Sequence, residues 1–201
     1  MREIADGIYH WTSFHEGIRQ DVSSYLVEGS GTLIDPRVPP EGLDWFRARR
    51  APERIVLTIR HHYRHSEAFE REFGIEVLCH EHGLHEFAGG PAVRGFSFGD
   101  LLTSDVTALE MDAISPDDTV LRIHAAGGAL AFGDGLVNYG SDRVGFVPDG
   151  LMGDDPEEVK RGLRRSLERL LDQEFQHLLF AHGEPIVGSG RATLTRFLNQ
   201  E

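Results

Sequence analysis

The sequence predicts an α/β fold, and three observations lead to this class. A β-branched apolar run at residues 54–59, a helical pattern at 66–73 and a second apolar run at 75–79 form a βαβ unit, which favours parallel strands. A second group of short strands is expected between residues 93 and 132, and helices follow it. The chain has 201 residues, 40% of them apolar, which suits one domain over residues 1–201 with a sizeable core.

The first forty residues predict an antiparallel opening of the sheet. Residues 7–11 alternate as a strand does, and the runs at 24–29 and 32–36 are joined by a Gly-Ser-Gly turn. Two prolines then precede residues 41–50, where Leu43, Trp45 and Phe46 would pack one helical face against the sheet.

The second half of the chain predicts a β-meander over 93–109 and a hairpin formed by residues 119–124 and 128–132. Asp155-Pro156-Glu157-Glu158 is a strong helix start, because it combines an acidic cap, proline at the first helical position and acids in the first turn. The last strand is expected over 175–181, and Ser189 would cap a final helix.

Three histidines and two arginines are concentrated in Arg60-His61-His62-Tyr63-Arg64-His65, directly after the first strand of the βαβ unit. Strand-to-helix turns of this kind line the ligand crevice in open α/β sheets. The turn is therefore the first candidate for a functional site.

This turn resembles the H-x-H-x-D-H signature of the metallo-β-lactamase fold, a superfamily of metal-dependent hydrolases. Arg60 takes the first histidine position, His62 the second, Arg64 the aspartate position and His65 the last histidine. Two of the four ligand positions of the signature thus keep a ligand.

Three further landmarks follow the order of that superfamily. The strand pair at 24–29 and 32–36 resembles its opening strands, residues 131–136 the strand that delivers a bridging aspartate, here Asp134, and residues 178–185 the strand ending in the last metal histidine, here His182. The resemblance implies a four-layer αββα sandwich, metallo-β-lactamase-like. It also places Asp35 beside the metal site without ligating, although a turn residue before Pro36 explains it equally well.

The resemblance implies that His62, His65, Asp134 and His182 hold one divalent metal ion, zinc in the first place, with iron or manganese as alternatives. Arginine has no lone pair to donate to a metal, so Arg60 and Arg64 cannot replace the ligands whose positions they occupy. A P-G-H-T-x-G loop, which supplies another histidine in two-metal members, is also missing, because only Ala-Ala-Gly stands between the hairpin strands at 125–127. We therefore expect at most a mononuclear site.

Two functions remain open, and the first is preferred because four ligand-type residues occupy positions of the superfamily. In the first, the protein is a metal-dependent hydrolase that uses water activated by the metal, and Arg60 or Arg64 binds an anionic group of a small-molecule substrate. In the second, it is a metal-free, catalytically inactive relative that binds a small anion or a protein partner through these arginines. Repulsion between a guanidinium and a dication about 4 Å apart, roughly 4 kcal/mol per unit charge at an effective dielectric of about 20, favours the second, with Arg64 paired to Asp134 instead.

Other histidines are expected to be structural. Cys79, His80, His82 and His85 match no closed zinc motif and are interpreted as polar residues of a strand exit and a short helix. His124 is expected to have no ligand role. The side chains of His10 and His15 are expected to be solvated or to lie at a sheet edge.

Charge and composition restrict the partners. Twenty Lys and Arg against 33 Asp and Glu give a net charge of -13, which disfavours nucleic acid and anionic membranes. The sequence shows no segment typical of a signal peptide or a transmembrane span. A single cysteine allows no internal disulfide, which fits a reducing cytoplasm. The expected partner is a small-molecule substrate, and the sequence predicts no oligomeric state.

Overall fold

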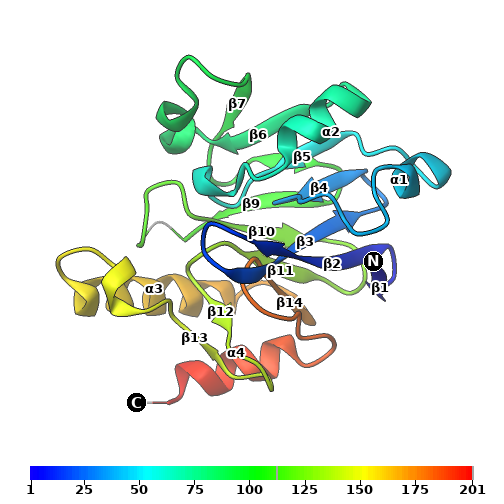
Figure 1. Cartoon of the computed structure of the whole chain (residues 1–201). Coiled ribbons are helices and arrows are strands. Elements are labelled where there is room, and N and C mark those ends of the chain that lie inside the picture. Colours follow the sequence, from blue (N-terminus) through cyan, green and yellow to red (C-terminus); the bar gives the residue numbers. More distant parts are fainter. Residues whose placement is uncertain (112, 201) are drawn as a thin grey trace.

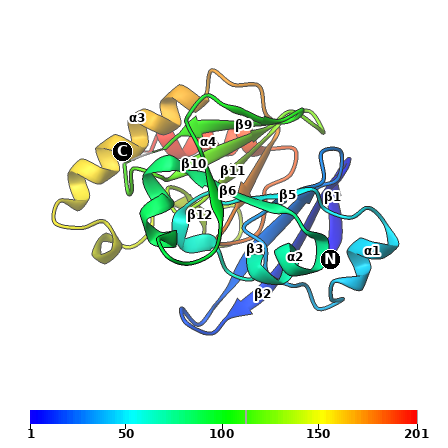
Figure 2. The same cartoon turned by 90° about the horizontal axis from the view of Figure 1, so that it is seen from above.

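The structure is a computed structural model that describes residues 1–111 and 113–200. Two β-sheets pack face to face, with α1 and α2 on the outside of one sheet and α3 and α4 on the outside of the other (Figures 1 and 2). The four-layer αββα architecture predicted from the sequence is confirmed.

The first sheet has seven strands in chain order. The strands are β1 (Arg2–Ala5), β2 (Ile8–His15), β3 (Gln20–Val27), β4 (Thr32–Ile34), β5 (Arg54–Val56), β6 (Glu76–His80) and β7 (Val93–Phe96). Pairing is antiparallel from β1 to β4 and parallel from β4 to β7, as the opening strands and the βαβ unit predicted. β5 is shorter than the expected 54–59, because Thr58 donates its backbone N–H to the Asp35 side chain instead of to a neighbouring strand.

The second sheet has five strands in the order β14-β11-β10-β9-β8. The strands are β8 (Leu101–Thr103), β9 (Val106–Glu110), β10 (Thr119–Ile123), β11 (Ala129–Phe132) and β14 (His177–Phe180). The predicted hairpin is confirmed as antiparallel β10 and β11, and β14 pairs with β11 in parallel. The expected meander over 93–109 is wrong in one respect, since β7 pairs with β6 and completes the first sheet. A separate ribbon is formed by β12 (Val137–Asn138) and β13 (Val144–Gly145).

The helices are α1 (Asp44–Ala48), α2 (Ser66–Phe73), α3 (Pro156–Leu170) and α4 (Gly190–Leu198), with 3-10 turns η1 (Arg60–His62), η2 (Glu81–Phe87) and η3 (Asp149–Leu151). α1 is shorter than the expected 41–50 because Gly42, with a φ of 74°, takes a left-handed conformation that a helix cannot include. Asp155 caps α3 as predicted by accepting the N–H of Glu158 at 3.0 Å. Ser189 precedes α4, but its side chain makes no capping hydrogen bond.

Apolar side chains fill the three spaces between the four layers. Alternation along β14 shows the principle: Leu178 and Phe180 pack toward α3 and α4, and Leu179 packs between the sheets. On the other outer face, α1 and α2 cover the first sheet with Phe46 and Phe69, which are fully buried. Because both sheets are held between two apolar layers, their strand ends are fixed relative to each other. Among the described residues, no helix has the length and apolarity needed to cross a membrane.

Candidate metal centre

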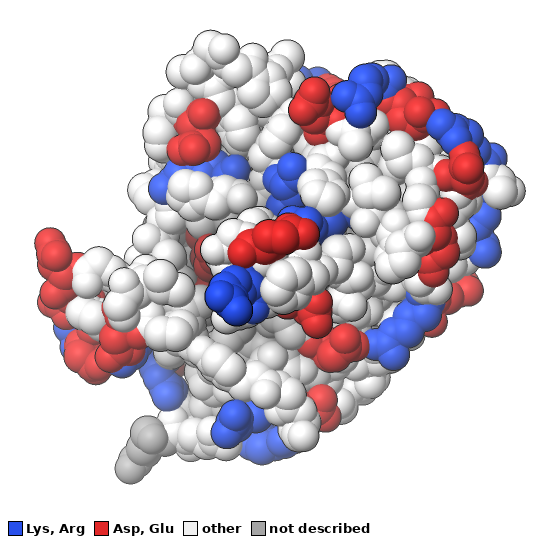
Figure 3. Space-filling model, viewed as in Figure 1, with Lys and Arg blue, Asp and Glu red and all other residues white. Residues whose placement is uncertain are grey.

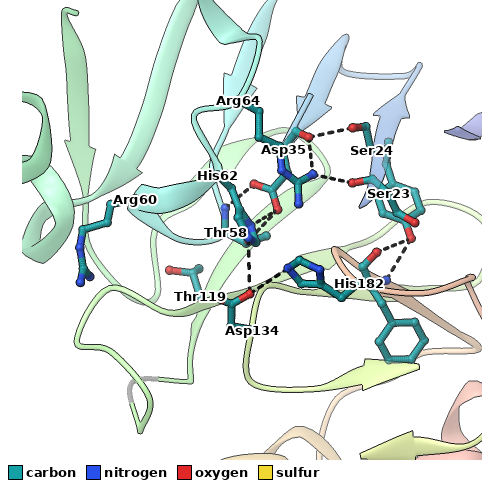
Figure 4. A network of polar contacts seen from close by, with 12 residues as sticks. Ser23, Ser24, Asp35, Thr58, Arg60, His62, Arg64, Thr119, Asp134 and His182 are labelled. Carbon is teal, nitrogen blue, oxygen red and sulfur yellow. Dashed lines mark hydrogen bonds and ion pairs between the residues drawn. The ribbon is translucent and has the colours of Figure 1, made fainter. Parts of the chain in front are cut away.

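Three ligand-type side chains from distant parts of the chain meet at one edge of the sandwich. His62 lies on η1 just after β5, and Asp134 and His182 follow the parallel strands β11 and β14. Asp134 Oδ1 lies 3.4 Å from Nε2 of His62 and 3.2 Å from Nε2 of His182. Figure 4 shows all three side chains pointing toward one another. We call them the His62–Asp134–His182 group.

Asp35 fixes the orientation of His62. The Nδ1 atom of His62 lies 2.9 Å from Asp35 Oδ2 and 3.1 Å from the hydroxyl of Thr58, so Nε2 is the nitrogen that faces Asp134 (Figure 4). Asp35 is itself held by the Thr58 N–H at 2.8 Å and is 1% exposed. It lies beside the group without joining it, and its φ of 46° shows that it also forms the turn after β4. A carboxylate that holds the outer nitrogen of a histidine is typical of metal-binding histidines.

Opposite charges dominate the electrostatics of the group. Burial and Arg64 each disfavour a charged His62, but Asp35 and Asp134 outweigh them and raise the pKa of His62 to about 9. Burial likewise opposes the charge of Asp134, yet His62 and His182 together hold the pKa of this carboxyl well below its usual range. The group thus favours a carboxylate at Asp134 and a protonated His62, so a metal ion that binds here would displace a proton from His62.

The geometry of the group fits a metal ion. Each of the three side chains offers one ligand atom, and these atoms lie within 4.8 Å of one another. Asp134 Oδ1 is buried without a well-aligned hydrogen bond from any described residue. Two ligands about 2.0–2.1 Å from a tetrahedral ion are about 3.3 Å apart, close to the 3.2 and 3.4 Å found here. The two separations that involve Asp134 thus match those at a single ion, and the ligand atoms of the two histidines lie within 4.8 Å of each other.

His65, the fourth expected ligand, does not join this group. Its Nδ1 accepts the backbone N–H of Val38 at 3.1 Å, and the residue forms the cap position of α2. Of the four expected ligand residues, the structure thus brings three together and places His65 apart from them.

The Arg60 side chain binds other residues of the protein, on the side of the turn away from the His62–Asp134–His182 group. Its guanidinium forms an ion pair with Asp117 and a hydrogen bond to Ser115, and its backbone N–H donates to Asp117 at 2.8 Å. In Figure 4 the Arg60 side chain points away from the His62–Asp134–His182 group. The positive charge expected to bind an anion is therefore already paired within the protein.

Arg64 binds backbone rather than Asp134. One guanidinium nitrogen donates to the carbonyls of Ser23 and Asp35 at 2.7 and 2.8 Å (Figure 4). The expected Arg64–Asp134 ion pair is not formed, because the two histidines take the Asp134 carboxylate. Arg64 has a φ of 48°, and this strained backbone turns its side chain toward β3 and away from the ligand atoms.

Comparison with known proteins finds matches only at the level of structure, since no family model and no curated protein matches the sequence. A metallo-β-lactamase from Pontibacter korlensis superposes with a TM-score of 0.69 at 16% identity, covering 99% of this chain and 98% of its own. A metallo-β-lactamase family protein from Thermus thermophilus gives 0.67 at 19% identity, covering 98% and 79%. The chain has the metallo-β-lactamase fold.

Solved proteins with the metallo-β-lactamase fold vary in their chemistry. A flavo di-iron protein mutant from Thermotoga maritima matches with a TM-score of 0.70 at 18% identity, covering 96% of this chain and 59% of its own. A metallo-β-lactamase from Cronobacter sakazakii, with a TM-score of 0.65 at 16% identity over 97% and 88%, is described by a HARLDQ motif.

A loop that the sequence did not single out lies over the centre. Residues 125–127 join β10 to β11 at the end of the strands far from Asp134. A histidine of the kind that the P-G-H-T-x-G loop supplies could therefore not reach the centre from this position. The connection at the correct end runs from β9 to β10 over residues 111–118 and includes Ile114 and Ser115. It contains no histidine, and Asp112 within it lies outside the described residues. The sequence could have indicated this loop, because the antiparallel strands β9 and β10 must be connected at the edge of the sheet where Asp134 lies.

A cleft of about 720 Å³ opens beside the group and includes Asp134 and His182 in its wall. Its other walls come from the hairpin between β2 and β3, from Ile114 and Ser115 and from residues 147–151. The sequence did not reveal this cleft because its walls are far apart along the chain.

The remaining histidines lie outside the centre. His10 is 2% exposed and contacts the Ser23 hydroxyl at 2.9 Å, so the expectation of a solvated or edge position is wrong for it. His80 stacks on Phe98, and His124 contacts Thr107 at the surface, 2.9 Å from its hydroxyl. Cys79 is buried, while His82 and His85 lie 3.1 and 2.8 Å from backbone carbonyls. Among the described residues, only His62, Asp134 and His182 form a group suited to a metal.

Proposed function

We propose that the protein is a metal-dependent hydrolase with one divalent ion, held by His62, Asp134 and His182. The observation that carries this proposal is the convergence of three ligand atoms, one of them a buried carboxylate oxygen without a well-aligned donor. Two imidazoles and a carboxylate are common ligands of zinc, and they also suit iron and manganese. Zinc is the first candidate.

Residues around the centre would each have a defined part. A bound ion would polarise a carbonyl or phosphoryl oxygen and activate water at neutral pH. Asp35 would hold His62 in the orientation that presents Nε2, and the cleft would admit the substrate beside Asp134 and His182. Arg64 would hold the histidine turn against β3 through its hydrogen bonds to the carbonyls of Ser23 and Asp35.

The test is metal content and affinity. Purified protein should carry about one equivalent of metal by elemental analysis, and chelator-treated protein should bind about one zinc ion by calorimetry. His62→Ala, Asp134→Ala and His182→Ala should each abolish this binding. Asp35→Asn should weaken it about 10- to 100-fold, because the carboxylate orients a ligand without touching the ion.

His65→Ala is the matched control, since this histidine comes from the same turn but binds the N–H of Val38. It should retain the metal. Loss of metal in His65→Ala with retention in His182→Ala would contradict the proposed ligand set.

The second candidate, a metal-free relative, is favoured by one observation. The arginine in the aspartate position of the motif, Arg64, is firmly held by two carbonyls next to His62, where it opposes a cation. If the wild-type protein neither carries nor binds zinc, iron or manganese, this candidate replaces the hydrolase.

A further inference from the structure

The cleft beside the His62–Asp134–His182 group has mainly apolar walls. Its volume of about 720 Å³ lies in the range of sites for small organic ligands. Apolar side chains reach it from every wall, and they include Ile18, Ile59, Ile114, Val137, Tyr139 and Leu151. A ligand that fills the cleft would remove this surface from water.

Several of these side chains are unusually exposed for their type. Ile18 is 48% exposed, Tyr139 49% and Leu151 67%. Six large apolar side chains among the described residues are exposed to this degree, and half of them line this one cleft. Exposed apolar surface gathered around a cavity is typical of a binding site.

The charges of the cleft disfavour an anion. Asp21 contributes negative charge, Asp134 is paired with His62 and His182, Arg60 is paired with Asp117, and Arg64 does not line the cleft. Figure 3 shows acidic and basic side chains in small separate groups on the face in view, with uncharged surface between them. An anionic substrate, expected from the two arginines, would therefore meet no unpaired guanidinium among the described lining residues.

We propose that the cleft binds an uncharged acyl compound, an ester or amide whose apolar acyl chain lies against Ile18, Ile114 and Leu151. Its carbonyl group would lie at the His62–Asp134–His182 group, and this placement rests on the proposed function. The apolar part of the proposal rests on the cleft alone.

The first test uses the neutral fluorescent probe N-phenyl-1-naphthylamine with the full chain after chelator treatment. The probe should bind with increased emission, and hexanamide should displace it. Acetamide should displace it poorly because its acyl group is short. Adipamate should displace it poorly because its carboxylate meets Asp21 and no unpaired guanidinium. Equal displacement by adipamate and hexanamide would overturn the preference for an uncharged ligand.

Substitutions in the cleft wall test whether the probe binds in the cleft. Leu151→Ser and Ile18→Ser should each weaken probe binding roughly three- to tenfold, since each removes apolar area from the wall. Leu101→Ser is the matched control, because Leu101 is 65% exposed on β8 and does not line the cleft. An equal effect of Leu101→Ser, or no binding by the wild type, would overturn the proposal.

Metal binding by the same variants separates this inference from the proposed function. Leu151→Ser and Ile18→Ser should bind the same amount of zinc as the wild type, because neither touches a ligand. Zinc binding without probe binding would overturn the apolar cleft alone. Probe binding without zinc binding would overturn the placement of the carbonyl, together with the hydrolase.

Discussion

Arg60 shows how a residue in a functional motif can serve the fold instead. Its partner Asp117 is fully buried, and the guanidinium, a serine hydroxyl and a backbone N–H all bind that carboxylate. Burial alone would raise the pKa of Asp117, but Ser115 and Arg60 outweigh it and lower this pKa below its usual value. The arginine thus keeps a buried carboxylate charged.

Arg60→Met should destabilise the protein by about 3 kcal/mol at pH 7, because it leaves Asp117 buried without its cation. A lowered pKa means that the stabilising effect of the charged carboxylate is present above about pH 4 and is lost as pH falls through the folded-state pKa. Urea unfolding at pH 7 and again near pH 3.5 measures both points. The difference between wild type and variant should shrink at the lower pH.

Arg94→Met is the control for this loss, since Arg94 pairs with Glu76 at 3.4 Å on the exposed surface. Its expected cost is below about 1 kcal/mol. A similar cost for both variants would show that the Arg60–Asp117 pair has no special role in stability.

Among the elements, η2 supports the turn that carries the site. The sequence drew attention to this segment for its histidines, but its contribution is close packing at Gly83. A Cβ atom there would lie 2.8 Å from Asp117 Oδ2, 2.9 Å from Cys79 Sγ and 3.0 Å from Arg60 Cβ. Only glycine lets η2 approach the ion pair this closely.

Gly83→Ala should therefore destabilise the protein by about 1–3 kcal/mol through overpacking. Gly150→Ala, on η3, is the control, because its added Cβ would meet nothing within 4 Å. Thermal unfolding of both variants checks the expectation. A Gly83→Ala variant as stable as wild type would mean that Cys79 and Arg60 can move aside without cost.

At the scale of the whole molecule, one hydroxyl joins the two sheets near the centre. Tyr25, on β3 of the first sheet, donates to the Phe180 carbonyl at 2.8 Å and accepts the Phe180 N–H at 3.0 Å, on β14 of the second sheet. The backbone of β3 also pairs with Ala181 through the Ser23 N–H at 2.9 Å. Because His182 follows these residues, the contacts between the sheets place it opposite His62.

Tyr25→Phe should cost about 1–3 kcal/mol, because it leaves the buried N–H and carbonyl of Phe180 without this partner. It should also weaken zinc binding, since the strand before His182 would lose its anchor. Urea unfolding and zinc calorimetry on the same samples measure the two effects. Tyr63→Phe, which loses only a hydroxyl contact with Glu70, should leave zinc binding unchanged.

The sequence alone determined the α/β class, the βαβ unit with α2 and the capped start of α3, because local periodicity and capping chemistry are properties of neighbouring residues. The candidates His62, His65, Asp134 and His182 came from the resemblance of its motifs to those of a known superfamily. The sequence also located the two arginines, whose chemistry excludes them as metal ligands.

Only the tertiary structure decided how these residues are used. It turned His65 toward Val38, paired Arg60 with Asp117 and anchored Arg64 on two carbonyls, and it placed Ile114 and Ser115 rather than residues 125–127 beside the centre. Side-chain direction and the closure of a cleft depend on contacts between residues far apart in sequence. Such contacts arise when two sheets pack face to face, and no local pattern encodes them.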